Sequence, residues 1–187
     1  MRSPAVCLPN PQRGAALVIA MLILLMLTSL GVAMFRSFGL QERIAGNTRE
    51  KQHAFQAAQS ALQFGEWWLI QGNANTGVAC SGALAATQVC SNAVAMATLT
   101  TAPWSIGSTY VPINVNGNPP LTVSTSGGVG TYYAAPQLYI NYMGLAPSGQ
   151  ARVYQVTAIG NGGDANSIAV VQSTYSVTTG IQDLGGL

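Results

Sequence analysis

The first feature of the chain is an apolar segment close to its N-terminus. The residues from Ala15 to Phe35 include no charged side chain, and as a helix they would span about 31 Å at ~1.5 Å per residue. This length matches a hydrocarbon core of about 30 Å. A secretory signal has an apolar run of only about 7–15 residues, followed by a small-residue cleavage site. We therefore expect a membrane helix that stays with the protein, in which Thr28 and Ser29 bond to carbonyls one turn earlier.

The helical pattern continues beyond this segment to Ile70, with apolar residues on one side and charges and amides on the other. Gly39 and Gly46 each weaken the helix by about 1 kcal/mol relative to Ala and are predicted bending points. Gly72 and Asn73 are expected to end the helix. The face predicted to lie on the rest of the protein comprises Ile44, Phe55, Ala58, Leu62 and Leu69, with Thr48 and Gln52 in its gaps.

An alternation of period two begins near Tyr110 and indicates a sheet. The predicted strands are Tyr110–Val115, Leu121–Thr125, Gln137–Met143, Val153–Ile159 and Ile168–Val177. In the last strand Ala169, Val171, Tyr175 and Val177 share one face, and Tyr154, Val156 and Ala158 oppose them. The fold class is therefore α+β: a long N-terminal helix, with a membrane half and an amphipathic half, packed on a C-terminal antiparallel sheet.

The connections in this second part are predicted to be loops. Gly160 to Ser167 is expected to be a turn, and a calcium site is the weaker alternative because Asp164 is its only carboxylate. The stretch from Gly72 to Gly130 is rich in Gly, Ser, Thr and Asn and is expected to form ordered loops with short elements. Trp67 and Trp68 are predicted to be buried against the sheet, with a ligand platform as the alternative.

Charge is distributed very unevenly and limits the possible functions. Six of the seven Lys and Arg residues lie at or before Lys51, and the net charge is +2. The C-terminal part has no basic cluster, which argues against a nucleic-acid surface. His53 is the only histidine and is expected to be solvated on the helix. No catalytic set, phosphate loop or metal cluster can be assembled from so few groups, so neither an enzyme nor a cofactor is expected.

Particular stretches resemble a known family. A short basic leader ends in "QRG", and a small residue, Ala15, and an uninterrupted helix follow. This arrangement is similar to that of type IV prepilins and pseudopilins. The pieces "LQERIAGN" and "AFQAAQSAL", with "YINYMG" and "VYQVTAIGNGG…VVQSTY" near the C-terminus, resemble the PilX family of minor pilins. The resemblance covers about half of the chain and implies a type IV pilin-like fold.

The resemblance implies a processing site and one departure from the usual pilin pattern. A prepilin peptidase would cut between Gly14 and Ala15, and the new amine would be methylated. Most pilins have a Glu at the fifth mature residue, where it neutralises the amine of a neighbouring subunit. Here that position is Ile19, which fits a subunit with nothing above it at the tip of a fibre. A degraded sequence in a protein that never polymerises is the competing interpretation.

Two cysteines remain in the mature chain, because Cys7 lies in the leader. Cys80 and Cys90 form an even pair, which favours a disulfide outside the membrane that would stabilise by about 2–3 kcal/mol. A metal site is the rival, although zinc needs about four ligands and no His, Asp or Glu lies nearby. An exported C-terminal part also favours an N-terminus on the cytoplasmic side, against the count of flanking Lys and Arg.

The resulting hypothesis is a minor pilin with four regions. These are a leader (1–14), a membrane and fibre-core helix (15–35), an amphipathic continuation (36–71), and a periplasmic or extracellular β domain (72–187) with loop-rich residues 72–130.

Such a protein would help to initiate type IV pilus assembly at or near the tip and support adhesion and twitching motility. Its expected partners are other minor pilins and the major pilin through the N-terminal helix, prepilin peptidase, the inner membrane, and a large tip adhesin. We expect it in the inner membrane as a single-pass protein before assembly and in the pilus at the cell surface afterwards. The alternatives are a tip pseudopilin of type II secretion and, from another class, a single-pass periplasmic binding or sensor protein.

Overall fold

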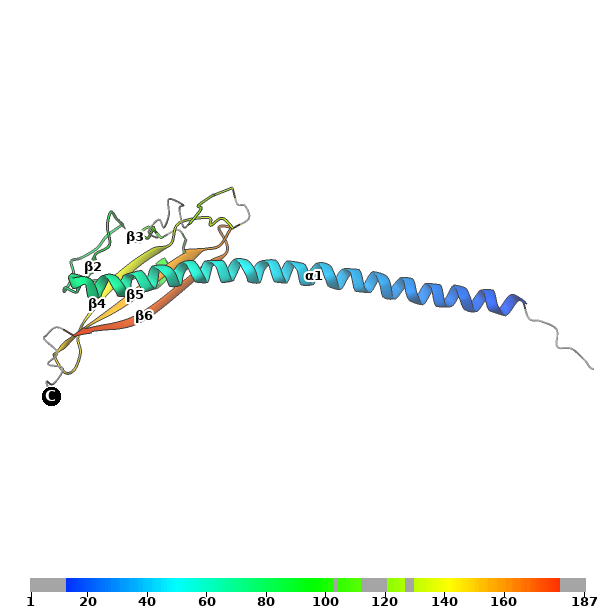
Figure 1. The fold of residues 1–187 in the computed structure, drawn as a ribbon, viewed down its shortest axis with the longest axis horizontal. Coiled ribbons are helices and arrows are strands. Elements are labelled where there is room, and N and C mark those ends of the chain that lie inside the picture. The colour runs from blue at the N-terminus through cyan, green and yellow to red at the C-terminus, as the bar shows by residue number, and fades with distance from the viewer. Residues whose placement is uncertain (1–12, 103, 112–120, 127–129, 179–187) are drawn as a thin grey trace, which may run out of the picture. The chain divides into compact units, whose positions relative to one another are not determined.

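The structure is a computed structural model that describes residues 13–102, 104–111, 121–126 and 130–178. The chain divides into two units, Met1–Gly46 and Asn47–Leu187. The first unit consists, where described, of helix alone, and the second contains the sheet and the described loops (Figure 1).

Helix α1 extends from Arg13 to Trp68, and the π-helical turn η1, Leu69–Asn73, follows it directly. The predicted long helix is therefore confirmed, and Gly31, Gly39 and Gly46 are all helical. No atom outside the local helix lies within 4 Å of the position that a Cβ would take at any of these three glycines. The helix ends where predicted, at Gly72, whose φ of 90° leaves the helical region.

Three long antiparallel strands form the main part of the sheet. They are β4 (Gln137–Leu145), β5 (Ala151–Asn161) and β6 (Ile168–Thr178). In register, Tyr154 lies opposite Tyr175 and Ala158 opposite Val171, so the predicted pairing of these two strands is confirmed. Exposure alternates along β6, which shows that one face of this strand is covered and the other is open.

Short elements that the sequence pattern did not indicate extend the sheet and make it mixed. They are β1 (Ala83–Leu84), β2 (Val89–Cys90), helix α2 (Met96–Leu99) and β3 (Gly107–Thr109). The strand order is β1-β3-β4-β5-β6, and β2 also pairs with β4. The pairings β1–β3 and β2–β4 are parallel.

Two predicted strands are not found where they were expected. In Tyr110–Val115 the described residues, Tyr110 and Val111, are not in a strand, and the rest lies outside the described residues. Leu121–Thr125 contributes only an isolated bridge between Val123 and Tyr132. Both stretches alternate in polarity. The segment that pairs with β4 is instead β3, through Ser108 and Thr109, which lie just before the first predicted stretch.

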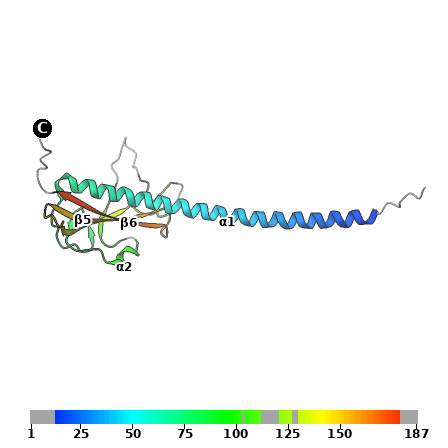
Figure 2. The same cartoon turned by 90° about the horizontal axis from the view of Figure 1, so that it is seen from below.

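The sheet separates two apolar clusters. Leu138, Ile140, Tyr154, Val156 and Ala158 pack against α1 on one face. The side chains of Tyr139 and Ile159 belong to the other face and pack with Cys90 and Trp104. The view in Figure 2 shows α2 and its flanking loops on the side of the sheet opposite α1. The second unit is therefore a three-layer structure of helix, sheet and a loop segment, which consists of α2 and the loops that flank it.

The face of α1 that meets the sheet differs from the predicted one. The buried residues described in α1 are all small, Ala54, Ala57, Ala58, Ala61 and Gly65, and Leu69 of η1 is also buried. Of the predicted face, Ala58 and Leu69 are buried and Leu62 is partly buried, whereas Phe55 is 46% exposed and Ile44 is 62% exposed. The physical reason is the closeness of the two elements, because a Cβ at Gly160 of β5 would lie 2.5 Å from the Ala58 nitrogen.

Candidate functional site

The apolar part of α1 carries more than half of the large hydrophobic residues that are exposed in the described chain. Ile19, near the start of the helix, is 56% exposed, and Phe35, at the end of the apolar part, is 79% exposed. The other large exposed residues are Leu17, Val18, Met21, Leu22, Ile23, Leu24, Leu25, Met26, Leu27, Leu30, Val32 and Met34. Soluble monomers rarely expose contiguous apolar patches of more than a few hundred Å², so this surface requires an apolar environment.

Among the described residues, one helix is long and apolar enough to cross a membrane. It begins at Gly14 and contains an 18-residue window with a mean hydropathy of 2.6, none of which is buried. The two hydroxyls of its apolar part, Ala15 to Phe35, are satisfied within the helix, because Thr28 donates to the Leu25 carbonyl (3.0 Å) and Ser29 to the Met26 carbonyl (2.9 Å). The predicted local bonds are therefore confirmed, and neither hydroxyl needs a partner from another molecule.

The residues predicted to be processed lie at the start of α1. Gly14 and Ala15 are helical and exposed, and residues 1–12 of the expected leader lie outside the described residues. Ile19 lies a little more than one turn after Ala15 on the same helix. The sequence from Ala15 to Phe35 offers no carboxylate that could neutralise an amine in an apolar environment.

Polar contacts attach the second unit's part of α1 to the sheet. The Glu50 carboxylate accepts a hydrogen bond from the Gly163 N–H (2.5 Å), and Lys51 donates to the Ile168 carbonyl (3.1 Å). Further along the helix, the Ser173 hydroxyl of β6 donates to Glu66 (2.6 Å). Charged residues of α1 thus hold the β5–β6 connection, and Glu50 is partly buried.

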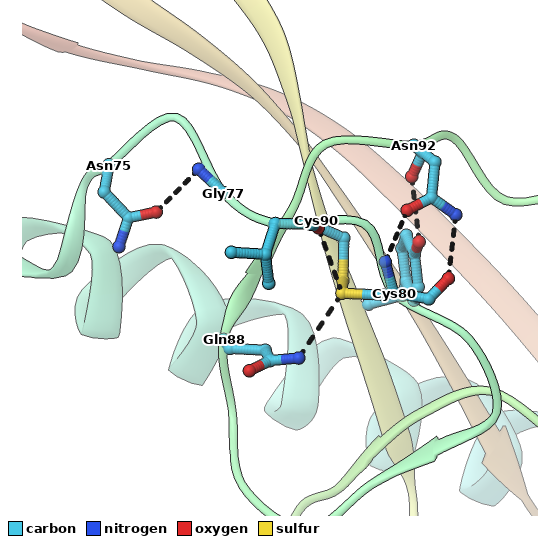
Figure 3. Close-up of a disulfide and its surroundings, with 8 residues drawn as sticks. Asn75, Gly77, Cys80, Gln88, Cys90 and Asn92 are labelled. Atoms are coloured by element: carbon cyan, nitrogen blue, oxygen red, sulfur yellow. Dashed lines mark hydrogen bonds between the residues drawn. A yellow bond between two sulfur atoms is a disulfide. The ribbon is translucent and has the colours of Figure 1, made fainter.

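The disulfide between Cys80 and Cys90 holds the loop segment to the sheet. The two Cα atoms are 5.4 Å apart, and Cys90 is fully buried beside Trp104. Asn92 both accepts from the Cys80 N–H (2.7 Å) and donates to the Cys80 carbonyl (3.0 Å), as Figure 3 shows. Of the two alternatives left open by the sequence, the structure contains the disulfide.

The β5–β6 turn is organised by Asp164. Its carboxylate accepts bonds from the Asn166 N–H (2.7 Å), the Ser167 N–H (3.0 Å) and the Ser167 hydroxyl (2.7 Å). The hydroxyl contact, with smaller contributions from the two N–H groups and Lys51, lowers the pKa of Asp164 despite slight desolvation. Within the described ranges, no group of three or more His, Cys, Asp or Glu residues could hold a metal ion.

The aromatic residues near the helix have different positions from those predicted. Trp68 is partly buried and packs on the core, but Trp67 is 50% exposed, so the prediction that both are buried is wrong for Trp67. The two indoles lie about 100° apart around the helix axis, and only one side faces the sheet. His53 is half-buried, with its ring centroid 6.0 Å from that of Tyr132, instead of solvated.

The comparisons with known proteins agree with these features. The family described as PilX N-terminal matches residues 13–63, and the family described as type IV pilus assembly protein PilX C-term matches residues 73–177. The first match covers the apolar helix and its continuation, and the second covers the disulfide segment and the sheet. No curated protein and no solved structure matches the chain.

Proposed function

Because this chain belongs to the PilX family of type IV pilus assembly proteins, we propose that it is a minor pilin that helps to start fibre assembly. The observation that supports this proposal is the pair of family matches, which together extend from residue 13 to residue 177 with a short gap. The family comprises structural components of the pilus. The protein accordingly acts by binding to other subunits.

The exposed apolar surface of α1 supports a role in two different environments. In lipid, the segment from Gly14 onward satisfies its backbone internally, as a membrane helix must. Its side chains contact acyl chains or neighbouring helices with similar free energy, because helix association in membranes depends on packing rather than on a hydrophobic driving force. The same surface therefore serves in the inner membrane before assembly and among pilin helices in the fibre core afterwards.

Ile19 supports a place at or near the tip. After cleavage between Gly14 and Ala15, the new amine is a charge in an apolar environment, which costs about 3 kcal/mol on insertion scales. A carboxylate of the adjacent subunit relieves this cost. The present chain offers no carboxylate at position 19, so it cannot neutralise the amine of a subunit above it. It can still present its own amine to a subunit that arrives below.

This arrangement leads to the expected partners and location. Other minor pilins and the major pilin bind through the N-terminal helix, prepilin peptidase acts at Gly14, and the sheet and loops select neighbours on the periplasmic side. A tip position would expose the loop segment to the exterior, where it would support adhesion and twitching motility, either directly or by holding a larger adhesin.

Mass spectrometry of sheared fibres tests the proposal. We expect a trace component whose N-terminal peptide begins at an N-methylated Ala15, and we expect few or no pili in a deletion strain. A Gly14→Val variant, altered on the leader side of the predicted cut, should remain unprocessed and fail to restore pili. An intact N-terminus on a protein absent from fibres would instead favour a single-pass periplasmic binding or sensor protein. Normal pili with failed secretion in the deletion strain would favour a pseudopilin.

A further inference from the structure

A pocket lies in the second unit at the C-terminal end of α1. Its volume is about 410 Å³, within the range of about 300–1,000 Å³ typical of small-molecule sites. Trp68 and Asn73 contribute one wall from the end of the helix and the π-helical turn. The segment from Asn75 to Val78 and the approach to β2, including Gln88, form the rest. Figure 3 shows Asn75, Gly77 and Gln88 of this lining.

The lining combines an aromatic ring with neutral polar groups and contains no charged residue. Each of its three carboxamides has one end engaged. Asn73 donates to the Trp68 carbonyl (2.9 Å), Asn75 accepts from the Gly77 N–H (2.8 Å), and Gln88 donates to the Cys80 sulfur (3.4 Å). Within the described part of the chain, the other ends bond to no protein group, so two acceptors and one donor are left for a ligand.

The main chain around the pocket is held in place before any ligand arrives. Arg152 donates to the Ala74 carbonyl (2.7 Å), and the Tyr154 hydroxyl donates to the Asn75 carbonyl (2.9 Å). Gly77 has a φ of 73°, and a Cβ there would lie 2.8 Å from the Val89 carbonyl oxygen, so this wall is pressed against β2. The Cys80–Cys90 disulfide fixes the same segment. Because these groups are already ordered, less conformational entropy is lost when a ligand binds.

We propose that this pocket binds a neutral saccharide unit. Sugar hydroxyls both donate and accept hydrogen bonds, as carboxamides do, and the C–H face of a pyranose ring packs well on an indole such as that of Trp68. The absence of a cationic lining residue argues against nucleotides, phosphates and acidic sugars, which need charge neutralisation. Only three of the nine lining residues, Trp68, Val78 and Val89, are large and apolar, which argues against a hydrophobic peptide side chain as the ligand.

Binding to the purified full-length chain tests the proposal, in a detergent without a sugar headgroup. The probes are glucose, galactose, mannose, N-acetylglucosamine and lactose, measured by saturation-transfer NMR and titration calorimetry. We expect saturable binding of at least one probe, weakened about tenfold by Trp68→Leu or Gln88→Leu through loss of one good contact. Trp67→Leu and Gln59→Leu are the matched controls, because both residues are exposed and outside the pocket, and they should leave the affinity unchanged.

A milder variant keeps the result interpretable if Trp68→Leu disturbs the core. Thr76 is exposed and lines the pocket, so Thr76→Ala should fold normally by circular dichroism and still weaken binding severalfold. The proposal is overturned if no neutral probe binds saturably, if only charged sugars bind, or if pocket and control variants bind equally. Binding by the isolated chain does not require a fibre, so this outcome is independent of the role in pilus assembly.

Discussion

The close approach of α1 to β5 gives a sharp prediction for Gly160→Ala. A Cβ at this position would overlap the Ala54 carbonyl oxygen and would lie 2.5 Å from the Ala58 nitrogen and 2.9 Å from the Ala57 Cβ. Two of these three atoms belong to the helix backbone and cannot move away by a side-chain rotation. Overpacking typically costs about 1–3 kcal/mol, and rigid neighbours place this variant at the upper end, near 3 kcal/mol.

The matched glycines of α1 form a graded control series. At Gly65 a Cβ would meet side-chain ends, Val156 Cγ1 at 2.9 Å and Leu138 Cδ1 at 3.2 Å. These can adjust, so Gly65→Ala should cost about 1 kcal/mol. At Gly46 no atom outside the local helix lies within 4 Å of the Cβ position, so Gly46→Ala should stabilise the helix by up to about 1 kcal/mol.

Thermal unfolding of the full chain, followed by circular dichroism, measures the series. One kcal/mol corresponds to about 2–4 °C for a protein of this size, so Gly160→Ala should lower Tm by about 6–12 °C. Gly65→Ala should lower it slightly, and Gly46→Ala should leave it unchanged or raise it. A Gly160→Ala protein that melts with the wild type would refute the close helix–sheet contact. Equal losses at all three positions would show that backbone flexibility, and not space, decides the outcome.

Three further predictions concern covalent, electrostatic and assembly features. Replacing Cys80 and Cys90 by Ala should lower the free energy of unfolding by about 2.7 kcal/mol for a loop of this length, and dithiothreitol should destabilise the wild type but not the variant in urea titrations. The pKa of Asp164 lies below its ordinary value of 3.8, so the stabilisation by its carboxylate is present above that pH and is lost as the pH falls through the folded-state pKa. Asp164→Asn should therefore remove this part of the acid sensitivity in thermal melts between about pH 2 and 5. An unchanged pH profile of the variant would contradict this prediction. Ile19→Glu should supply the absent carboxylate and raise the abundance of the chain in sheared fibres, measured by quantitative mass spectrometry against Val18→Glu; equal effects of both variants would count against the amine-pairing argument.

Periodicity predicts those parts of the fold in which side-chain polarity alone selects the structure. The helix was predicted to within a few residues of its end because apolar and polar residues alternate at the helical period up to Ile70. Strand β6 was predicted because it has one covered face and one open face, whereas β4 and β5 are buried on both faces over part of their length. The disulfide between Cys80 and Cys90 was predicted for a different reason, since two cysteines in one short loop have few other possible partners.

The remaining features depend on main-chain contacts that leave little trace in a polarity pattern. Strands β1, β2 and β3 have only two or three residues each, too few for any period to appear. The buried face of α1 was assigned to Phe55 because a large apolar residue normally indicates a core. A signal for the correct face was present in the spacing of Ala54, Ala58, Ala61 and Gly65, which allows a sheet to approach the helix backbone.

Side-chain size along α1 distinguishes what each part of the helix contacts. Between Leu17 and Phe35 most side chains are large, apolar and exposed, which suits lipid or neighbouring helices that adapt to them. Between Ala54 and Gly65 the buried side chains are small, because β5 comes close enough at Gly160 to touch the helix backbone. A large residue in the second region would separate helix and sheet, whereas small residues in the first would reduce the apolar surface available to a membrane or to neighbouring helices. One helix can therefore be fixed to its own sheet and still present an apolar surface to other partners along the rest of its length.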